Sequence, residues 1–173
     1  LISVDKVPVI IGGLCSTETA AFGPNAMEKG VVVFSYGSSA PNLSQLGEYF
    51  FRSYPSDAYQ GKFGAEYVYN TLGARKVAVL YHVSDWGTGI RNVFEARFQE
   101  LGGQIVSSDG APQESRDYRT MLSKVRGLND IDLIYMPMYP DGSIVALTQA
   151  AELGIKTRIF GADAWDDPKL HQE

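Results

Sequence analysis

The chain has 173 residues, and its 15 Lys and Arg against 20 Asp and Glu give a formal net charge of −5. Hydrophobic residues make up 45% of it and charged residues 20%, which excludes a disordered chain. Its apolar runs fall far short of the ~20 residues of a membrane helix. An acidic balance without a Lys/Arg cluster argues against nucleic acid as a partner. Length and composition therefore predict one ordinary globular domain or two small lobes.

Few residues are available for a disulfide or a metal site. Cys15 is the one cysteine, and the histidines are His82 and His171. We therefore expect neither a disulfide framework nor a metal or other cofactor, and a small buried thiol is the simplest interpretation of Cys15. The first residues show neither an initiator Met nor a signal peptide, so we expect a fragment whose chain opens inside a domain.

The first part of the chain contains two predicted β-α units. A strand over residues 7–12 is followed by a helix over residues 17–29, and a second strand covers residues 31–34. An irregular passage rich in Ser, Gly, Pro and Asn then runs over residues 35–56. A loop this long is unusual inside one compact domain, so we expect functional backbone and a crossing between lobes at residues 52–57.

The second part opens with a predicted helix and continues as a regular alternation of strands and helices. The helix spans residues 58–72, and its apolar side carries Phe63, Tyr67, Val68 and Leu72. Four β-type runs then begin 27 residues apart, at residues 77, 104, 131 and 158, with helical patterns over residues 90–101, 118–128 and 144–151. Parallel strands need crossovers, usually helices, so this alternation predicts a parallel sheet covered on both faces.

The loops after the first strands carry groups suited to a carboxylate. In open parallel α/β sheets, ligands bind beyond the carboxyl ends of the strands, where helix N-termini expose unpaired N–H groups. Hydroxyl groups, a backbone N–H at a glycine and a helix N-terminus hold a carboxylate without any formal positive charge. Ser16, Gly37 and Ser39 fit this role.

The loops after the later strands carry aromatic rings and an acid. An ammonium group needs a carboxylate and the face of an aromatic ring, which Asp163 with Tyr139 or Trp86 would supply. With the hydroxyl groups of the earlier loops, these residues would hold an α-amino acid.

Each of these residues also has a simpler structural interpretation. Ser16 would be a helix N-cap, residues 37–39 a turn, and Asp163 a cap of the turn that follows it. Trp86 and Tyr139 would be aromatic rings that cover a sheet edge. A ligand site is favoured because five separate loops present compatible groups at the same sheet edges.

Six stretches of the sequence carry these residues and their surroundings. They are IGGLCSTET, EKGVVVFSYGSSAPNL, KVAVLYHVSDWGTG, LGGQIVSSDG with the downstream RDYRTMLSKVR, DLIYMPMYPDG and AELGIKTRIFGADAW. As an ordered set they resemble the type I periplasmic solute-binding proteins of branched-chain amino-acid (leucine/isoleucine/valine-binding) ABC transporters. The resemblance implies an α/β fold of two lobes with doubly wound parallel sheets. The chain would hold part of lobe one, residues 1–54, and most of lobe two, residues 55–173.

The resemblance implies how lobe one holds a ligand carboxylate. Ser16 is similar in position to the family's first-lobe hydroxyl group, and Gly37 and Ser39 to the backbone and hydroxyl groups that complete the grip. Family members often carry Thr where Ser39 stands. Cys15 stands where the family commonly has a disulfide to an upstream cysteine, which this sequence lacks, so the thiol is either unpaired or has lost its partner.

The resemblance also implies how lobe two closes over the ligand. Trp86 and Tyr139 match the family's second-lobe aromatic rings, and Asp163 matches the acid that pairs with the α-ammonium group. Branched-chain members often carry Tyr where Trp86 stands and Glu where Asp163 stands. A larger ring and a shorter acid reshape the pocket, so a related amino acid or another small carboxylate is also a candidate ligand.

The function implied is that of a periplasmic, extracytoplasmic component of an ABC importer. It would bind an amino acid or similar small carboxylate by hinge closure and present the closed form to the permease. A ligand-sensing receptor domain of the same fold is the alternative.

A nucleotide-dependent enzyme is the third interpretation, and the motifs argue against it. The stretch at residues 87–89 lacks the third glycine of the phosphate-binding fingerprint, and His82 with Asp85 has no evident nucleophile. We therefore expect no enzyme activity.

Since a partial lobe one would expose apolar faces to solvent, we expect either a proteolytic remnant or a chain that oligomerises or swaps a domain.

Overall fold

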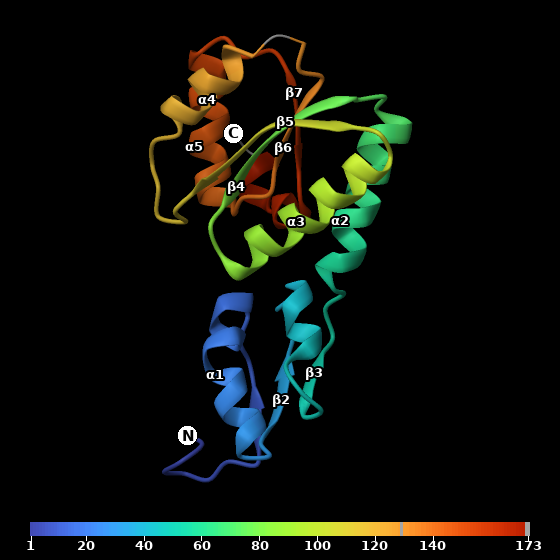
Figure 1. Cartoon of the computed structure of the whole chain (residues 1–173). Helices are drawn as coiled ribbons and strands as arrows, with labels where there is room; N and C mark the ends of the chain where they lie inside the picture. The colour runs from blue at the N-terminus through green and yellow to red at the C-terminus, as the bar shows by residue number, and fades with distance from the viewer. Residues whose placement is uncertain (129, 172–173) are drawn as a thin grey trace.

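The computed structural model describes residues 1–128 and 130–171 and contains two separate parallel sheets (Figure 1). The first has the order β1-β2-β3, with β1 Val9–Ile11, β2 Val32–Ser35 and β3 Phe50–Arg52. The second has the order β5-β4-β6-β7, with β4 Lys76–His82, β5 Gln104–Ala111, β6 Leu133–Met136 and β7 Arg158–Gly161. Every strand pair is parallel, so the predicted fold class is confirmed.

Helix α1, Ser16–Glu28, packs against one face of the first sheet through Ala26 and Val33. On the opposite face, Ile11, Phe34 and Phe51 are 75%, 39% and 52% exposed. They lie side by side, because the register pairs Ile11 with Phe34 and Phe34 with Phe51. The apolar face expected for a partial lobe one is therefore present.

The passage predicted as irregular contains regular structure, which corrects that prediction. A 3-10 turn spans Pro41–Gln45, and β3 pairs in parallel with β2. The strand has three residues, too few for an alternating pattern to stand out in the sequence. Its hydrogen bonds to β2, which is distant in sequence, are what define it.

The remaining helices surround the second sheet. They are α2 Asp57–Glu66 with a π-helical turn at Tyr67–Thr71, α3 Asp85–Glu100, α4 Arg119–Arg126, α5 Pro140–Glu152, a 3-10 turn at Asp163–Trp165 and α6 Pro168–His171. Figure 1 shows α4 and α5 on one side of this sheet and α2 and α3 on the other. The strands predicted near residues 77, 104, 131 and 158 are confirmed, with starts at 76, 104, 133 and 158.

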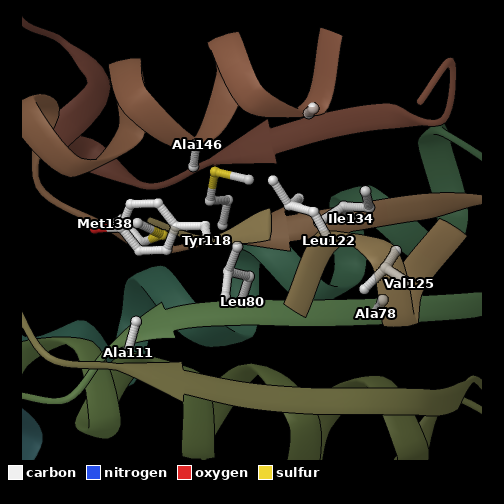
Figure 2. Packing of buried hydrophobic residues seen from close by; sticks show 11 residues of the cluster. Ala78, Leu80, Ala111, Tyr118, Leu122, Val125, Ile134, Met138 and Ala146 are labelled. Atoms are coloured by element: carbon white, nitrogen blue, oxygen red, sulfur yellow. The ribbon is translucent and has the colours of Figure 1, made fainter. Parts of the chain in front are cut away.

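Both faces of the second sheet are buried. On one face Leu80 and Ile134 pack against Tyr118 and Leu122, as Figure 2 shows. On the other face Phe94 and Phe98 of α3 belong to a second cluster with Tyr135. All four residues of β6 are buried, which explains its continuous apolar run.

The apolar side predicted for α2 is wrong at two positions. Phe63 is 70% exposed and Tyr67 is 38% exposed. The buried side of α2 carries small residues such as Gly61, because α3 approaches closely there. A Cβ atom at Gly61 would lie 2.8 Å from Val93 Cβ of α3.

Candidate functional site

A cavity of about 470 Å³ lies where the loops of the two sheets meet. All six candidate residues line it: Ser16, Gly37 and Ser39 from the side of the first sheet, and Trp86, Tyr139 and Asp163 from the side of the second. Asp166 and Asp167 also line it, and no Lys or Arg does so among the described residues. The predicted residues therefore share one cavity with an acidic lining.

The hydroxyl group of Ser16 has a proton available for a ligand. Its Oγ accepts hydrogen bonds from the backbone N–H groups of Ser39 at 3.2 Å and Ala40 at 3.0 Å. Because a hydroxyl group carries one proton and two acceptor lone pairs, this leaves the O–H free to donate. Cys15, and not Ser16, is the N-cap residue of α1, so the simpler interpretation of Ser16 as a cap does not hold.

The side chain of Glu18 already binds two of the backbone N–H groups at the start of α1. The carboxylate of Glu18 accepts from the N–H groups of Leu14 at 3.0 Å and Cys15 at 3.2 Å. A negative group at a helix N-terminus offsets the positive end of its dipole. A carboxylate in the cavity would therefore depend mainly on the Ser16 hydroxyl group and on the loop at residues 37–39.

That loop is held by Ser35, which the sequence analysis did not select. Its Oγ donates to the carbonyl oxygen of Gly13 at 2.6 Å and accepts from the N–H of Ser38 at 2.9 Å. A Cβ atom at Gly37 would lie 2.5 Å from Leu14 Cδ1 and 3.0 Å from the Leu14 carbonyl oxygen. A larger residue here would have to displace the Leu14 side chain, so this close approach favours glycine.

The two aromatic candidates form one stacked pair. The ring centroids of Trp86 and Tyr139 are 4.6 Å apart, with an interplanar angle of 26°. Trp86 lies in the first turn of α3, where Ser84 caps the helix by accepting from the N–H of Gly87 at 3.0 Å. The pair therefore forms an aromatic wall of two stacked rings on the side of the second sheet.

Cys15 and Tyr139 also line a larger cavity of about 870 Å³, which adjoins the first. The other five candidate residues do not line it. Burial is the main factor that raises the pKa of the Cys15 thiol, which keeps it in the neutral form. Cys15 is partly buried and unpaired, and the contact between Cys15 and Tyr139 joins the two halves of the structure.

His82 holds the backbone of Tyr139 in place. Its Nδ1 accepts from the Tyr139 N–H at 3.1 Å, and its Nε2 lies 3.2 Å from the hydroxyl oxygen of Tyr118. The side chain is fully buried, and burial is the main cause that lowers its pKa to about 4. The neutral ring therefore carries its proton on Nε2, which donates to Tyr118. His82 supports the aromatic wall, a role that its spacing in the sequence does not reveal.

Asp163 has one oxygen bound and one unpartnered. Its Oδ2 accepts from the hydroxyl group of Tyr54 at 2.8 Å, while its buried Oδ1 has no hydrogen-bond partner among the described residues. Burial, with the hydrogen bond and charge of Asp163, raises the pKa of Tyr54 to about 12, so Tyr54 stays a donor. Tyr54 was not selected from the sequence, because its partner lies 109 residues away.

Two facing sets of α/β loops, one rich in hydroxyl groups and one aromatic and acidic, define the class of two-lobed α/β binding proteins. Within this class, one family matches nearly the whole chain. The model of the periplasmic binding protein family matches residues 1–172, and the chain belongs to this family.

The described residues contain no group of His, Cys, Asp and Glu placed to hold a metal ion. Among them there is also no helix with the length and apolar character to cross a membrane.

Individual relatives agree with the family match. The crystal structure of the leucine-binding protein LivK from Thermotoga maritima superposes with a TM-score of 0.91 at 32% identity, over 98% of this chain and 48% of that one. LivJ from Streptococcus pneumoniae, solved in complex with isoleucine, gives a TM-score of 0.83 at 29% identity, over 99% and 49% of the two chains.

The leucine-specific-binding protein of Salmonella typhimurium is 26% identical over 96% of this chain and 45% of its own length. These comparisons confirm the resemblance to branched-chain amino-acid-binding proteins. The chain spans about half the length of these relatives.

Proposed function

We propose that the protein is the extracytoplasmic solute-binding component of an ABC importer and binds an amino acid, branched-chain or related, or a similar small carboxylate. One observation carries the proposal. Ser16, whose hydroxyl proton is free, and Asp163, whose Oδ1 has no partner among the described residues, line one cavity from the sides of two different sheets. A zwitterion needs such a donor and such an acceptor at separate ends. The names of the similar proteins, which bind leucine or isoleucine, support the same ligand class.

In this proposal each half of the cavity holds one end of the ligand. The hydroxyl groups of Ser16 and Ser39 and the N–H of Gly37 bind the carboxylate, and Asp163 binds the ammonium group. Trp86 and Tyr139 cover the ligand. A ligand shifts a closing equilibrium only through contacts that the closed state adds, so the contacts from the second half would drive closure.

We further propose that lobe one covers residues 1–54 and lobe two residues 55–173. The chain leaves the first sheet after β3, which ends at Arg52, and α2 begins at Asp57 with Ser56 as its N-cap. The short segment between them would act as a hinge, and the closed form would be the one that the permease recognises. The similar proteins are named as binding proteins, so we propose binding and no catalysis.

A thermal-shift screen tests this proposal on the protein expressed from its complete gene. The screen covers amino acids, amides and aromatic acids, and a ligand at 100 times its dissociation constant should add about 2.7 kcal/mol to the free energy of unfolding. The Ser16→Ala variant removes the free proton and should lose most of this shift. If no zwitterion or carboxylate raises the melting temperature, the proposal is wrong.

A further inference from the structure

A buried acid, Asp57, lies behind the proposed carboxylate grip without any assigned role. It is the first residue of α2 and is 1% exposed. Its backbone N–H donates to the carbonyl oxygen of Ser39 at 2.9 Å. Neither oxygen of its carboxyl group has a hydrogen-bond partner among the described residues. Burying an acid without hydrogen-bond partners costs free energy of folding, and such a group often has a functional role.

The charged and titratable groups around Asp57 come from every neighbouring element. They are Arg52 of β3, Tyr54 of the crossing segment, Tyr135 of β6 and Asp163 after β7. Arg52 donates to the carbonyl oxygen of Ala40 at 3.0 Å and forms no ion pair with Asp57 in the described part of the chain. The negative charge of an ionised Asp57 would therefore stay without a direct counter-charge.

These surroundings favour the neutral acid. Burial is the largest cause that raises the pKa of Asp57, to about 7, and the charge of Asp163 acts in the same direction. Arg52 and the Ser39 side chain act in the opposite direction. Ser39 lies close enough to influence the acid, although it is not placed to form a hydrogen bond with it. A like charge nearby disfavours the ionised form of an acid, so Asp163 adds to the effect of burial on Asp57.

We propose that Asp57 is a positioning residue that acts as a neutral carboxylic acid behind Ser39, and that its ionised form repels the carboxylate of the ligand. This inference rests on the proposed function and adds a protonation requirement to it. Its position supports the assignment, since the acid is in backbone contact with Ser39 and separated from solvent. Ligand binding and proton binding at Asp57 would then favour each other.

The size of the effect follows from the fraction of neutral acid. The apparent dissociation constant equals the intrinsic one divided by the competent fraction. For a group that titrates near neutrality, this fraction falls about tenfold between pH 6 and pH 8. Leucine stays a zwitterion over this range. His82 titrates near pH 4 and Tyr54 near pH 12, so neither contributes to the change.

Calorimetry with L-leucine at pH 6, 7 and 8, on the protein from its complete gene, tests the inference. We expect the affinity of the unchanged protein to fall about tenfold from pH 6 to pH 8. Asp57→Asn, which is permanently neutral, should bind at pH 8 as the unchanged protein binds at pH 6. Asp85→Asn is the matched control, because Asp85 is likewise the first residue of a helix after a serine N-cap, and it should keep the tenfold dependence.

Each outcome has a distinct meaning. A constant affinity of the unchanged protein over this range contradicts the role of Asp57 and leaves the proposed function intact. A tenfold dependence of affinity on pH that persists in Asp57→Asn also contradicts the role of Asp57 and leaves the proposed function intact. If Asp57 only stabilises the start of α2, Asp57→Asn lowers the melting temperature and leaves the pH profile unchanged, which also overturns the inference. Absence of leucine binding at all three pH values contradicts the branched-chain function, and the inference with it.

Discussion

The two oxygens of the Asp163 carboxylate differ in their surroundings. Tyr54 binds one oxygen at 2.8 Å, and the other oxygen is buried and unpartnered. A buried acceptor without a partner carries a desolvation cost that a ligand ammonium group would remove. The tyrosine fixes the orientation of the carboxylate, and an ammonium group would have to reach the buried second oxygen from the cavity that Asp163 lines.

The Asp163→Asn variant tests this assignment at the level of one residue. An amide of the same size keeps the shape of the site and removes its counter-charge. We expect amino-acid binding to weaken by about 2 kcal/mol or more, measured by calorimetry. Tyr54→Phe, which removes only the orienting hydrogen bond, should cost less. Unchanged affinity of Asp163→Asn would reject the pairing with the ammonium group.

The contact between α2 and α3 shows how an element is placed by small residues and not by large ones. A Cβ atom at Gly61 would lie 2.8 Å from Val93 Cβ and 3.1 Å from the Ile90 carbonyl oxygen. At Gly64, one turn further, the nearest atoms are 3.7 Å away in Phe94 and 3.8 Å away in Phe160. These two glycines lie in one helix and differ mainly in the space around them.

Alanine substitutions at these two positions should therefore have opposite effects on stability. Alanine favours a helix over glycine by up to about 1 kcal/mol, so Gly64→Ala should stabilise the protein. At Gly61 the added methyl group meets backbone and a branched side chain, and overpacking costs about 1–3 kcal/mol. Urea denaturation measures both variants. If Gly61→Ala is as stable as Gly64→Ala, the close packing of α2 on α3 is not rigid.

At the scale of the whole molecule, two buried groups give opposing contributions to acid stability. The pKa of His82 is lowered from 6.5 to about 4, so the unfolded chain binds more protons there and stability falls as the pH falls from 6.5 to 4. The pKa of Asp57 is raised from 3.8 to about 7, so the folded chain binds more protons there and stability rises as the pH falls through the same range. Each contribution reaches about 3–4 kcal/mol at most.

The expected outcome is partial cancellation, which single variants should reveal. The free energy of unfolding of the unchanged protein should vary little between pH 6.5 and pH 4 from these two groups. Asp57→Asn should lose stability on acidification, because only the His82 contribution is left. His82→Gln should gain stability on acidification, because only the Asp57 contribution is left. Chemical denaturation across this pH range measures the slopes, and identical slopes in all three proteins would show that neither group is buried in the way described.

Local patterns predicted most of the elements of the molecule. The 27-residue spacing of apolar runs located the four strands of the second sheet, because a strand buried on both faces is apolar throughout. The three-residue strand β3 was missed, and the exposed Phe63 was assigned to the buried side of α2. Both errors concern contacts with segments that a local pattern does not contain.

The sequence by itself determined the alternation of strands and helices, the parallel fold and the polar and aromatic character of the loops, since these follow from the order of residues along the chain. Only the tertiary structure decided which groups meet. Tyr54 reaches Asp163, His82 holds Tyr139, and Asp57 lies against Ser39. The physical reason is that hydrogen bonding and burial depend on distance in space. Residues far apart in the chain acquire their partners, and their shifted pKa values, only when the two sheets bring them together.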